Sequence, residues 1–198
     1  MANRLAKSSL SDMKGVMQEL NTAEPRSCIL VGASMVEYAL ETVILHTLGE
    51  GKLKADIKYL FDDQNAIYSS FERKIWGAYF ANIIGPRTRS DIDLIRRIRN
   101  HCAHTMKRIG FDEPPIADRC KSFGLTKGAW KKAVIGERRA HLSVVIPAID
   151  DASSLRGRFL FVIGVIASHL LLKAAFAGSE MDKQASDLQK LFKASVDA

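Results

Sequence analysis

Residues 154–177 read SLRGRFLFVIGVIASHLLLKAAFA, a stretch that is apolar on nearly every side. A helix of this kind is either buried in the core of a helical protein or spans a membrane. His169 and Lys173 lie one helical turn apart within it. Because a lone cation is costly in lipid, whereas a long lysine side chain in a bundle can reach the surface, the stretch predicts a buried core helix and no membrane attachment. Ser153 or Ser154 is expected to cap its first turn.

A second helix, predicted to begin at Pro25, is almost as apolar. Proline is favoured at the first helical position, and Gly49 and Gly51 are expected to end the helix. Two carboxylates, Glu37 and Glu41, interrupt this apolar element. Since buried carboxylates need partners, they are expected either to pair with an arginine of the charged helix that is predicted to begin near Ser90 or to orient a functional site. The apolar positions of this helix are Ile29, Leu30, Val31, Met35, Val36, Leu40, Val43 and Ile44.

Shorter helices are predicted on either side of this element. Residues 10–21 place apolar side chains at spacings of three and four, which predicts an amphipathic helix. Farther along the chain, Ser69 stands three residues before Glu72, the pattern of a capping box at a helix start. The Gly-Pro pair at 85–86 is expected to end that helix, and the next is expected to begin near Ser90.

The helix expected from Ser90 has an apolar side and a charged side. Its predicted inward residues are Ile92, Ile95, Ile98, Cys102 and Met106. Its predicted outward residues are Asp93, Arg96, Arg97, Asn100 and His104. One interpretation of the outward set is a solvated polar face, with Asp93 bonded to Arg97 at the i, i+4 spacing.

The same helix carries the sequence RNHCAH at 99–104. Arg99 and His104 point about 140° apart on an ideal helix, whereas Asn100 and His104 share a face with Arg96. Arg99 and His104 are therefore poor partners within one chain. A two-fold dimer that packs this helix against its mate would bring Arg99 and Asn100 of one protomer near the other His104.

Composition narrows the classes of function. The net charge of +7 favours polyanionic partners such as RNA, DNA or a phosphorylated ligand. The cysteines, Cys28, Cys102 and Cys120, lack a C-x-x-C spacing and fit a reducing cytoplasm. His101 and His104 are spaced like a metal pair, but no further ligand spacing accompanies them, so neither a metal nor another cofactor is expected. Nucleotide-binding glycine motifs and the common hydrolase motifs are absent from the sequence.

The chain is predicted to form one all-α domain, a bundle of about six or seven helices over residues 1–178. A polar tail or short helix is expected at 179–198. Between residues 110 and 147 the helical periodicity weakens, and LSVVIPAI at 142–149 fits either a short strand or a helical turn.

Residues 62–121 resemble the mannitol operon repressor family. The resemblance of this segment is carried by S-S-F-x-x-K-I, by L-I-R-R-I-R-N-x-x-A-H and by F-D-x-P-x-I-x-D-R-C. Together with the apolar helix before it and R-G-R-F-L near Arg158, it covers most of the chain. It implies a helical fold and, as one alternative, a catalytically silent transcriptional regulator that acts through protein partners. No helix-turn-helix is visible in the sequence, so specific DNA reading is not expected of this chain.

The core of that segment also resembles the R-x4-6-H motif of the HEPN superfamily of helical nucleotide-binding domains. The resemblance implies a metal-independent ribonuclease site composed from two protomers, with Arg99, Asn100 and His104 as catalytic residues and Arg96 and Glu37 as supporting ones. The favoured hypothesis is an RNA-directed HEPN-type homodimer, either a toxin-like endoribonuclease with an antitoxin partner or an RNA-binding regulator. A third, weaker hypothesis is a sensor of a small phosphorylated ligand gripped by Arg96 and Arg99.

Overall fold

The computed structural model describes residues 2–48, 60–61, 65–127, 151 and 153–176, with side chains described from residue 12 to residue 175 of these ranges. Within them the protein is all-helical and has no strand, which confirms the predicted fold class. The six α-helices are α1 (Ala2–Thr22), α2 (Pro25–Leu48), α3 (Phe71–Phe80), α4 (Pro86–His104), α5 (Pro114–Ser122) and α8 (Leu155–Phe176), and a 3-10 turn, η2 (Gly124–Thr126), follows α5.

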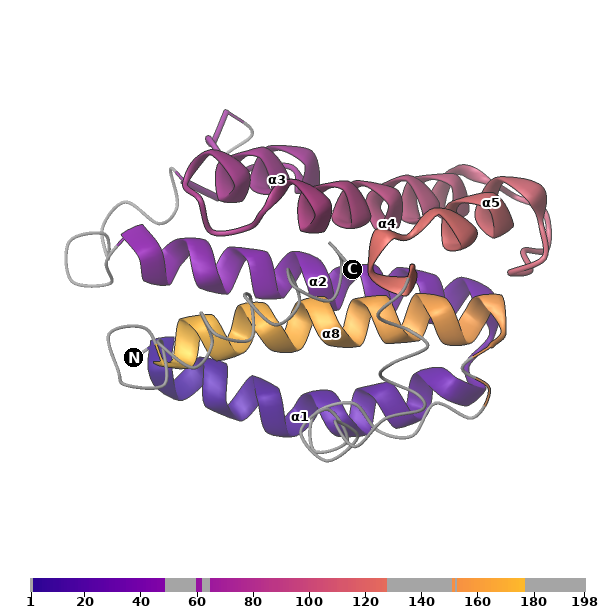
Figure 1. Ribbon diagram of the computed structural model, residues 1–198, viewed down its shortest axis with the longest axis horizontal. Helices are drawn as coiled ribbons and strands as arrows, with labels where there is room; N and C mark the ends of the chain where they lie inside the picture. The colour runs from indigo at the N-terminus through magenta and orange to yellow at the C-terminus, as the bar shows by residue number, and fades with distance from the viewer. Residues whose placement is uncertain (1, 49–59, 62–64, 128–150, 152, 177–198) are drawn as a thin grey trace.

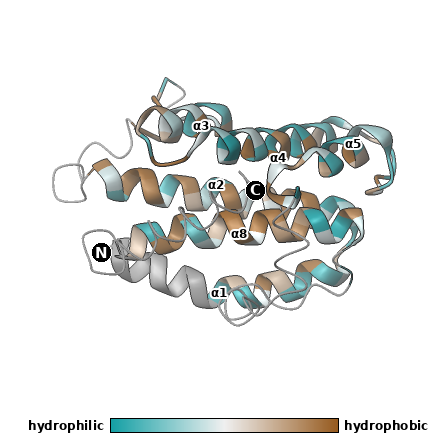
Figure 2. Ribbon diagram, viewed as in Figure 1, coloured by the Kyte–Doolittle hydropathy of each residue, from teal (hydrophilic) through white to brown (hydrophobic). Residues whose placement is uncertain are grey.

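The bundle is built around α8, which lies between α1 and α2 (Figure 1). Helices α3 and α4 cover the other side of α2, and α5 packs on α4 and α8. Gly32 allows α2 to approach α8 closely, because a Cβ at this position would lie 2.5 Å from Cδ1 of Ile163. The apolar residues of α2 and of the middle of α8 contrast with the mainly hydrophilic residues of α4 (Figure 2).

The expectations for α8 and the start of α2 agree with the structure. Helix α2 begins at Pro25, and Ser154 accepts a hydrogen bond from the backbone N–H of Gly157 (2.9 Å) at the first turn of α8. By length and composition both helices could cross a membrane, but 78% of the apolar stretch of α8 is buried inside the protein, as in the core helix of a soluble protein. Lys173 reaches the backbone carbonyl of Ile83 (3.0 Å) at the edge of the bundle.

The expected boundaries of α3 and α4 were wrong in detail. Ser70, not Ser69, caps α3 by accepting the N–H of Arg73 (3.2 Å), so the capping box with Glu72 is not formed. This start places the buried Phe71 in the first turn. Helix α4 begins at Pro86 because proline has helical φ and needs no backbone donor in a first turn.

Two more boundaries differ. The predicted 10–21 helix is longer, since α1 spans Ala2–Thr22. Met106 was expected to face inward, yet it is 99% exposed, because α4 ends at His104 and the helical period no longer applies beyond it. The predictions for Gly49 and Gly51, for 142–149 and for the 179–198 tail lie outside the described residues.

Candidate functional site

Helix α4 carries Arg99, Asn100 and His104, and contacts with the rest of the bundle fix its position. Its apolar side is fully buried at Ile95, Ile98 and Cys102. Arg26 of α2 fixes its C-terminal end by donating hydrogen bonds to three backbone carbonyls, those of Cys102, Thr105 (2.8 Å) and Lys107 (2.7 Å). These carbonyls lie on both sides of His104 and include one that the end of the helix leaves without an intrahelical donor. Arg26 is not among the site residues predicted from the sequence.

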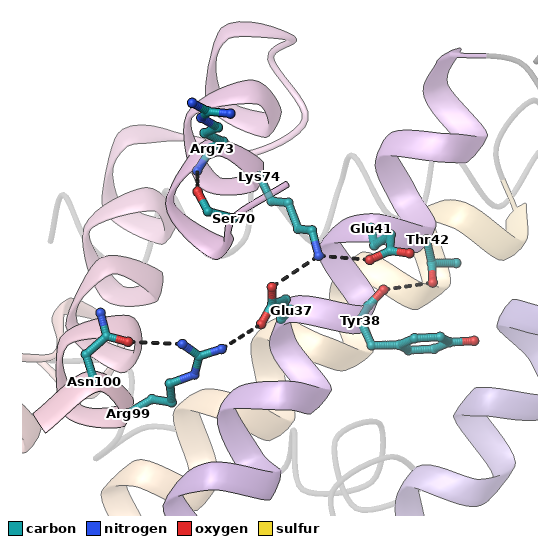
Figure 3. Close-up of polar contacts among 9 residues, drawn as sticks. All are labelled: Glu37, Tyr38, Glu41, Thr42, Ser70, Arg73, Lys74, Arg99 and Asn100. Atoms are coloured by element: carbon teal, nitrogen blue, oxygen red, sulfur yellow. Dashed lines mark hydrogen bonds and ion pairs between the residues drawn. The ribbon is translucent and has the colours of Figure 1, made fainter. Parts of the chain in front are cut away.

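Arg99 lies on the side of α4 that faces α2. Its Nη2 is 3.3 Å from Oε2 of Glu37, and its Nη1 donates to Oδ1 of Asn100 at 3.1 Å (Figure 3). The pairing of Glu37 with an arginine of this helix is therefore present, as the sequence suggested. With about 36% of its side chain exposed, Arg99 is held in place and yet accessible to a ligand.

Glu41, by contrast, pairs with a lysine that the sequence analysis did not single out. Lys74 of α3 is only 8% exposed, and its Nζ lies 3.1 Å from Oε1 of Glu37 and 2.9 Å from Oε2 of Glu41 (Figure 3). Burial lowers the pKa of Lys74, but the hydrogen bonds to both carboxylates outweigh it and raise the pKa above its usual value. We call Glu37, Glu41, Lys74, Arg99 and Asn100 the ion-pair network.

Asn100 and His104 open onto a shallow depression of about 450 Å³. Arg99 does not line it. The lining residues are Arg96, Arg97, Asn100, His101, His104, Thr105 and Arg119. The structure thus brings Asn100, His104 and Arg96 to one surface and leaves Arg99 beside it, joined to it through the side chain of Asn100. We call this surface the α4 depression.

The α4 depression is basic. Asp93 is shared by Arg96 (2.7 Å) and Arg97 (2.8 Å), and Arg96 is also 3.5 Å from Glu72. Partial burial raises the pKa of Asp93, but the two guanidinium groups outweigh it and lower the pKa below its usual value. Two carboxylates, Asp93 and Glu72, therefore face two arginines, and Arg119 adds a third cation from α5. An anion such as a phosphate diester fits this charge.

The cysteines and the histidine pair offer no competing chemistry in the described part of the chain. No group of three or more His, Cys, Asp or Glu residues there could hold a metal ion. Burial raises the pKa of Cys28 to about 11 and that of Cys120 to about 12, so these buried thiols are poor nucleophiles. His101 faces Glu113 at 3.6 Å.

A comparison of the chain with protein-family models, curated proteins and solved structures finds no match.

Proposed function

We propose that the protein is an RNA-directed, HEPN-type endoribonuclease that needs no metal and acts as a homodimer in the cytoplasm. The observation that supports this most is the α4 depression itself, where two imidazoles and a carboxamide lie among three arginines on one accessible surface. The side-chain carbonyl oxygen of Asn100 accepts a hydrogen bond from Arg99. The side-chain N–H groups of Asn100 can therefore donate to a phosphoryl oxygen.

The chemistry follows from these groups. The 2′-OH of a ribose attacks the adjacent phosphorus, His104 takes the hydroxyl proton, and the bond to the 5′-oxygen breaks. The proton that His104 has taken returns to the departing 5′-oxygen through water, and the product ends are a 2′,3′-cyclic phosphate and a 5′-OH. Arg99 and Asn100 stabilise the charge that develops on the phosphoryl oxygens. DNA lacks the attacking hydroxyl and is not cut.

The proposed composite site requires α4 to lie against its two-fold mate. Ala103 is exposed and lies between Arg99 and His104 around the helix, about 40° from Arg99 by the 100° step. Because alanine is small, two helices can approach closely at this position. An antitoxin is one partner that would cover the same surface.

The dimer is tested with a single engineered cysteine. We expect a dimer in light scattering, and we expect Ala103→Cys to form a disulfide between protomers under mild oxidation, since the three native thiols are buried. The matched control is Ala81→Cys, at an exposed position beyond α3, which should stay reduced. A monomer, or a dimer that cross-links through residue 81 and not through residue 103, contradicts the composite site.

The activity is tested with purified protein and mixed RNA in EDTA. We expect cleavage with 2′,3′-cyclic phosphate ends and no cleavage of single-stranded DNA of the same sequence. Cleavage that EDTA abolishes contradicts the mechanism. Intact RNA contradicts the enzyme and leaves a catalytically silent regulator acting through protein partners as the better account.

A further inference from the structure

A cluster of three aromatic side chains, two of them exposed and one half-buried, lies on α3, outside the α4 depression. Phe80 is 73% exposed and Trp76 is 41% exposed, and their rings stack with centroids 5.6 Å apart and an interplanar angle of 23°. Tyr79 meets Trp76 edge to face at 6.1 Å. Soluble proteins seldom leave several large rings together on the surface unless the surface binds something. We call these three residues the α3 aromatic cluster.

An arginine of α4 gives this cluster a positive charge. The guanidinium carbon of Arg89 lies 4.7 Å from the centroid of Trp76 and 5.3 Å from that of Tyr79. The ring of Phe80 stacks on Trp76, one of the two rings that Arg89 contacts, and is the most exposed of the large apolar side chains on α3. Aromatic rings beside arginine are the features with which proteins bind single-stranded nucleic acid, because bases stack on the rings and phosphates meet the cations.

Arg89, which contacts the cluster, lies along one stripe of α4 with residues of the α4 depression. By the 100° helical step, Arg89, Arg96 and Asn100 fall within about 40° of one another. The rise of 1.5 Å per residue separates Arg89 from Asn100 by about 16 Å. A single strand stacked at about 3.4 Å per nucleotide covers this distance with about five nucleotides, and a more extended strand with fewer. One strand can therefore reach both places.

A second copy of this chain fits the cluster less well. A two-fold contact through it would bring the two copies of Arg89 face to face, and like charges repel. The carboxylate nearest in sequence to the cluster, Glu72, already lies 3.5 Å from Arg96. A polyanion with aromatic faces satisfies both the exposed rings and the arginine.

We propose that the α3 aromatic cluster is a base-stacking subsite for single-stranded RNA, in which Phe80 stacks on a nucleobase a few nucleotides from the bond that is cut. The inference rests on the proposed function for the identity of the strand. The contacts of the α3 aromatic cluster with a strand do not involve the residues proposed to cleave it.

The test measures binding of a 2′-O-methylated oligouridylate about ten nucleotides long, a probe that lacks the attacking hydroxyl and stays intact. The comparison probe is an abasic strand of the same length and charge. We expect Phe80→Ala to weaken binding of the oligouridylate by about 5- to 150-fold, the equivalent of one lost stacking contact. Binding of the abasic strand should not change, and Phe80→Tyr should bind the oligouridylate as wild type does. The matched control is Ile67→Ala, which removes an apolar side chain that is 63% exposed and outside the cluster.

Equal effects of Phe80→Ala on both probes, or no effect on either, would overturn the subsite. So would dissociation of the dimer by Phe80→Ala with nucleic-acid binding unchanged, since the cluster would then hold a second copy of the chain. If wild type cleaves RNA but binding does not depend on Phe80, the subsite is wrong and the ribonuclease proposal stands. If binding depends on Phe80 but wild type does not cleave RNA, the ribonuclease proposal is wrong and the subsite stands.

Discussion

His104→Ala is expected to lower RNA cleavage at least about 100-fold and to leave most RNA binding intact, because general acid–base catalysis by one side chain contributes at least that factor. His104 is one of two imidazoles in the α4 depression, and the other, His101, faces Glu113. The arginines around it, which supply most of the attraction for phosphates, are unchanged by the substitution. The measurement is the initial rate of cleavage of mixed RNA together with a binding titration on an uncleavable strand.

The control for His104 is His101→Gln, since His101 lines the same depression but faces Glu113. We expect it to retain cleavage. If the His104 variant cleaved as fast as wild type, or if the His101 variant alone lost activity, the assignment of the proton-transferring residue would be wrong.

Arg99→Lys is also expected to lose RNA cleavage, because lysine cannot reproduce the geometry of the guanidinium group. The guanidinium contacts Glu37 through one nitrogen and Asn100 through another, and this fork orients it beside the depression. A lysine ammonium is a point charge and cannot keep both contacts while meeting a phosphate. Arg108→Lys, at an exposed position beyond α4, is the matched control and should cleave as wild type does.

The sequence predicted the helices that carry a local signal. The apolar runs of α2 and α8, together with Pro25 and Ser154, predicted both elements and their starts. Pro86 was misread because proline is compatible with the end of one helix and with the first residue of the next. The adjacent serines 69 and 70 are chemically equivalent caps, and only burial of Phe71 distinguishes them.

For the candidate site too, the sequence predicted relations within one helix and missed contacts between helices. The helical step correctly separates Arg99 from the face shared by Asn100 and His104, because that relation lies within one helix. Arg26 and Lys74 were missed, since they contact groups on other helices that are distant in sequence. For Lys74 the available signal was its place on the same face of α3 as Phe71, Ile75 and Ala78, where a buried lysine needs a carboxylate partner.

Lys74 has the largest expected effect on stability. Lys74→Met should lower the free energy of unfolding by about 2–4 kcal/mol. Without the ammonium group, Arg99 is the one cation of the ion-pair network left for the carboxylates of Glu37 and Glu41. The lower part of this range reflects the exposure of Glu41, whose side chain is 36% accessible to solvent. The raised pKa of Lys74 means that its contribution is fully present below the unfolded-state value of about 10.5 and is lost only as pH rises through the folded-state value.

The effect is therefore measured at pH 7, by urea unfolding followed by circular dichroism at one protein concentration, because the stability of a dimer depends on concentration. Adding Glu41→Gln to Lys74→Met should recover part of the loss, since it removes the carboxylate that has no other cation in the network. Lys121→Met is the matched control. Its ammonium is exposed and lies 3.9 Å from Asp118, so its removal should change stability by less than about 0.5 kcal/mol. If Lys74→Met were as stable as this control, the network would not hold α2, α3 and α4 together, and the orientation of Arg99 would have to come from Glu37 and Asn100 alone.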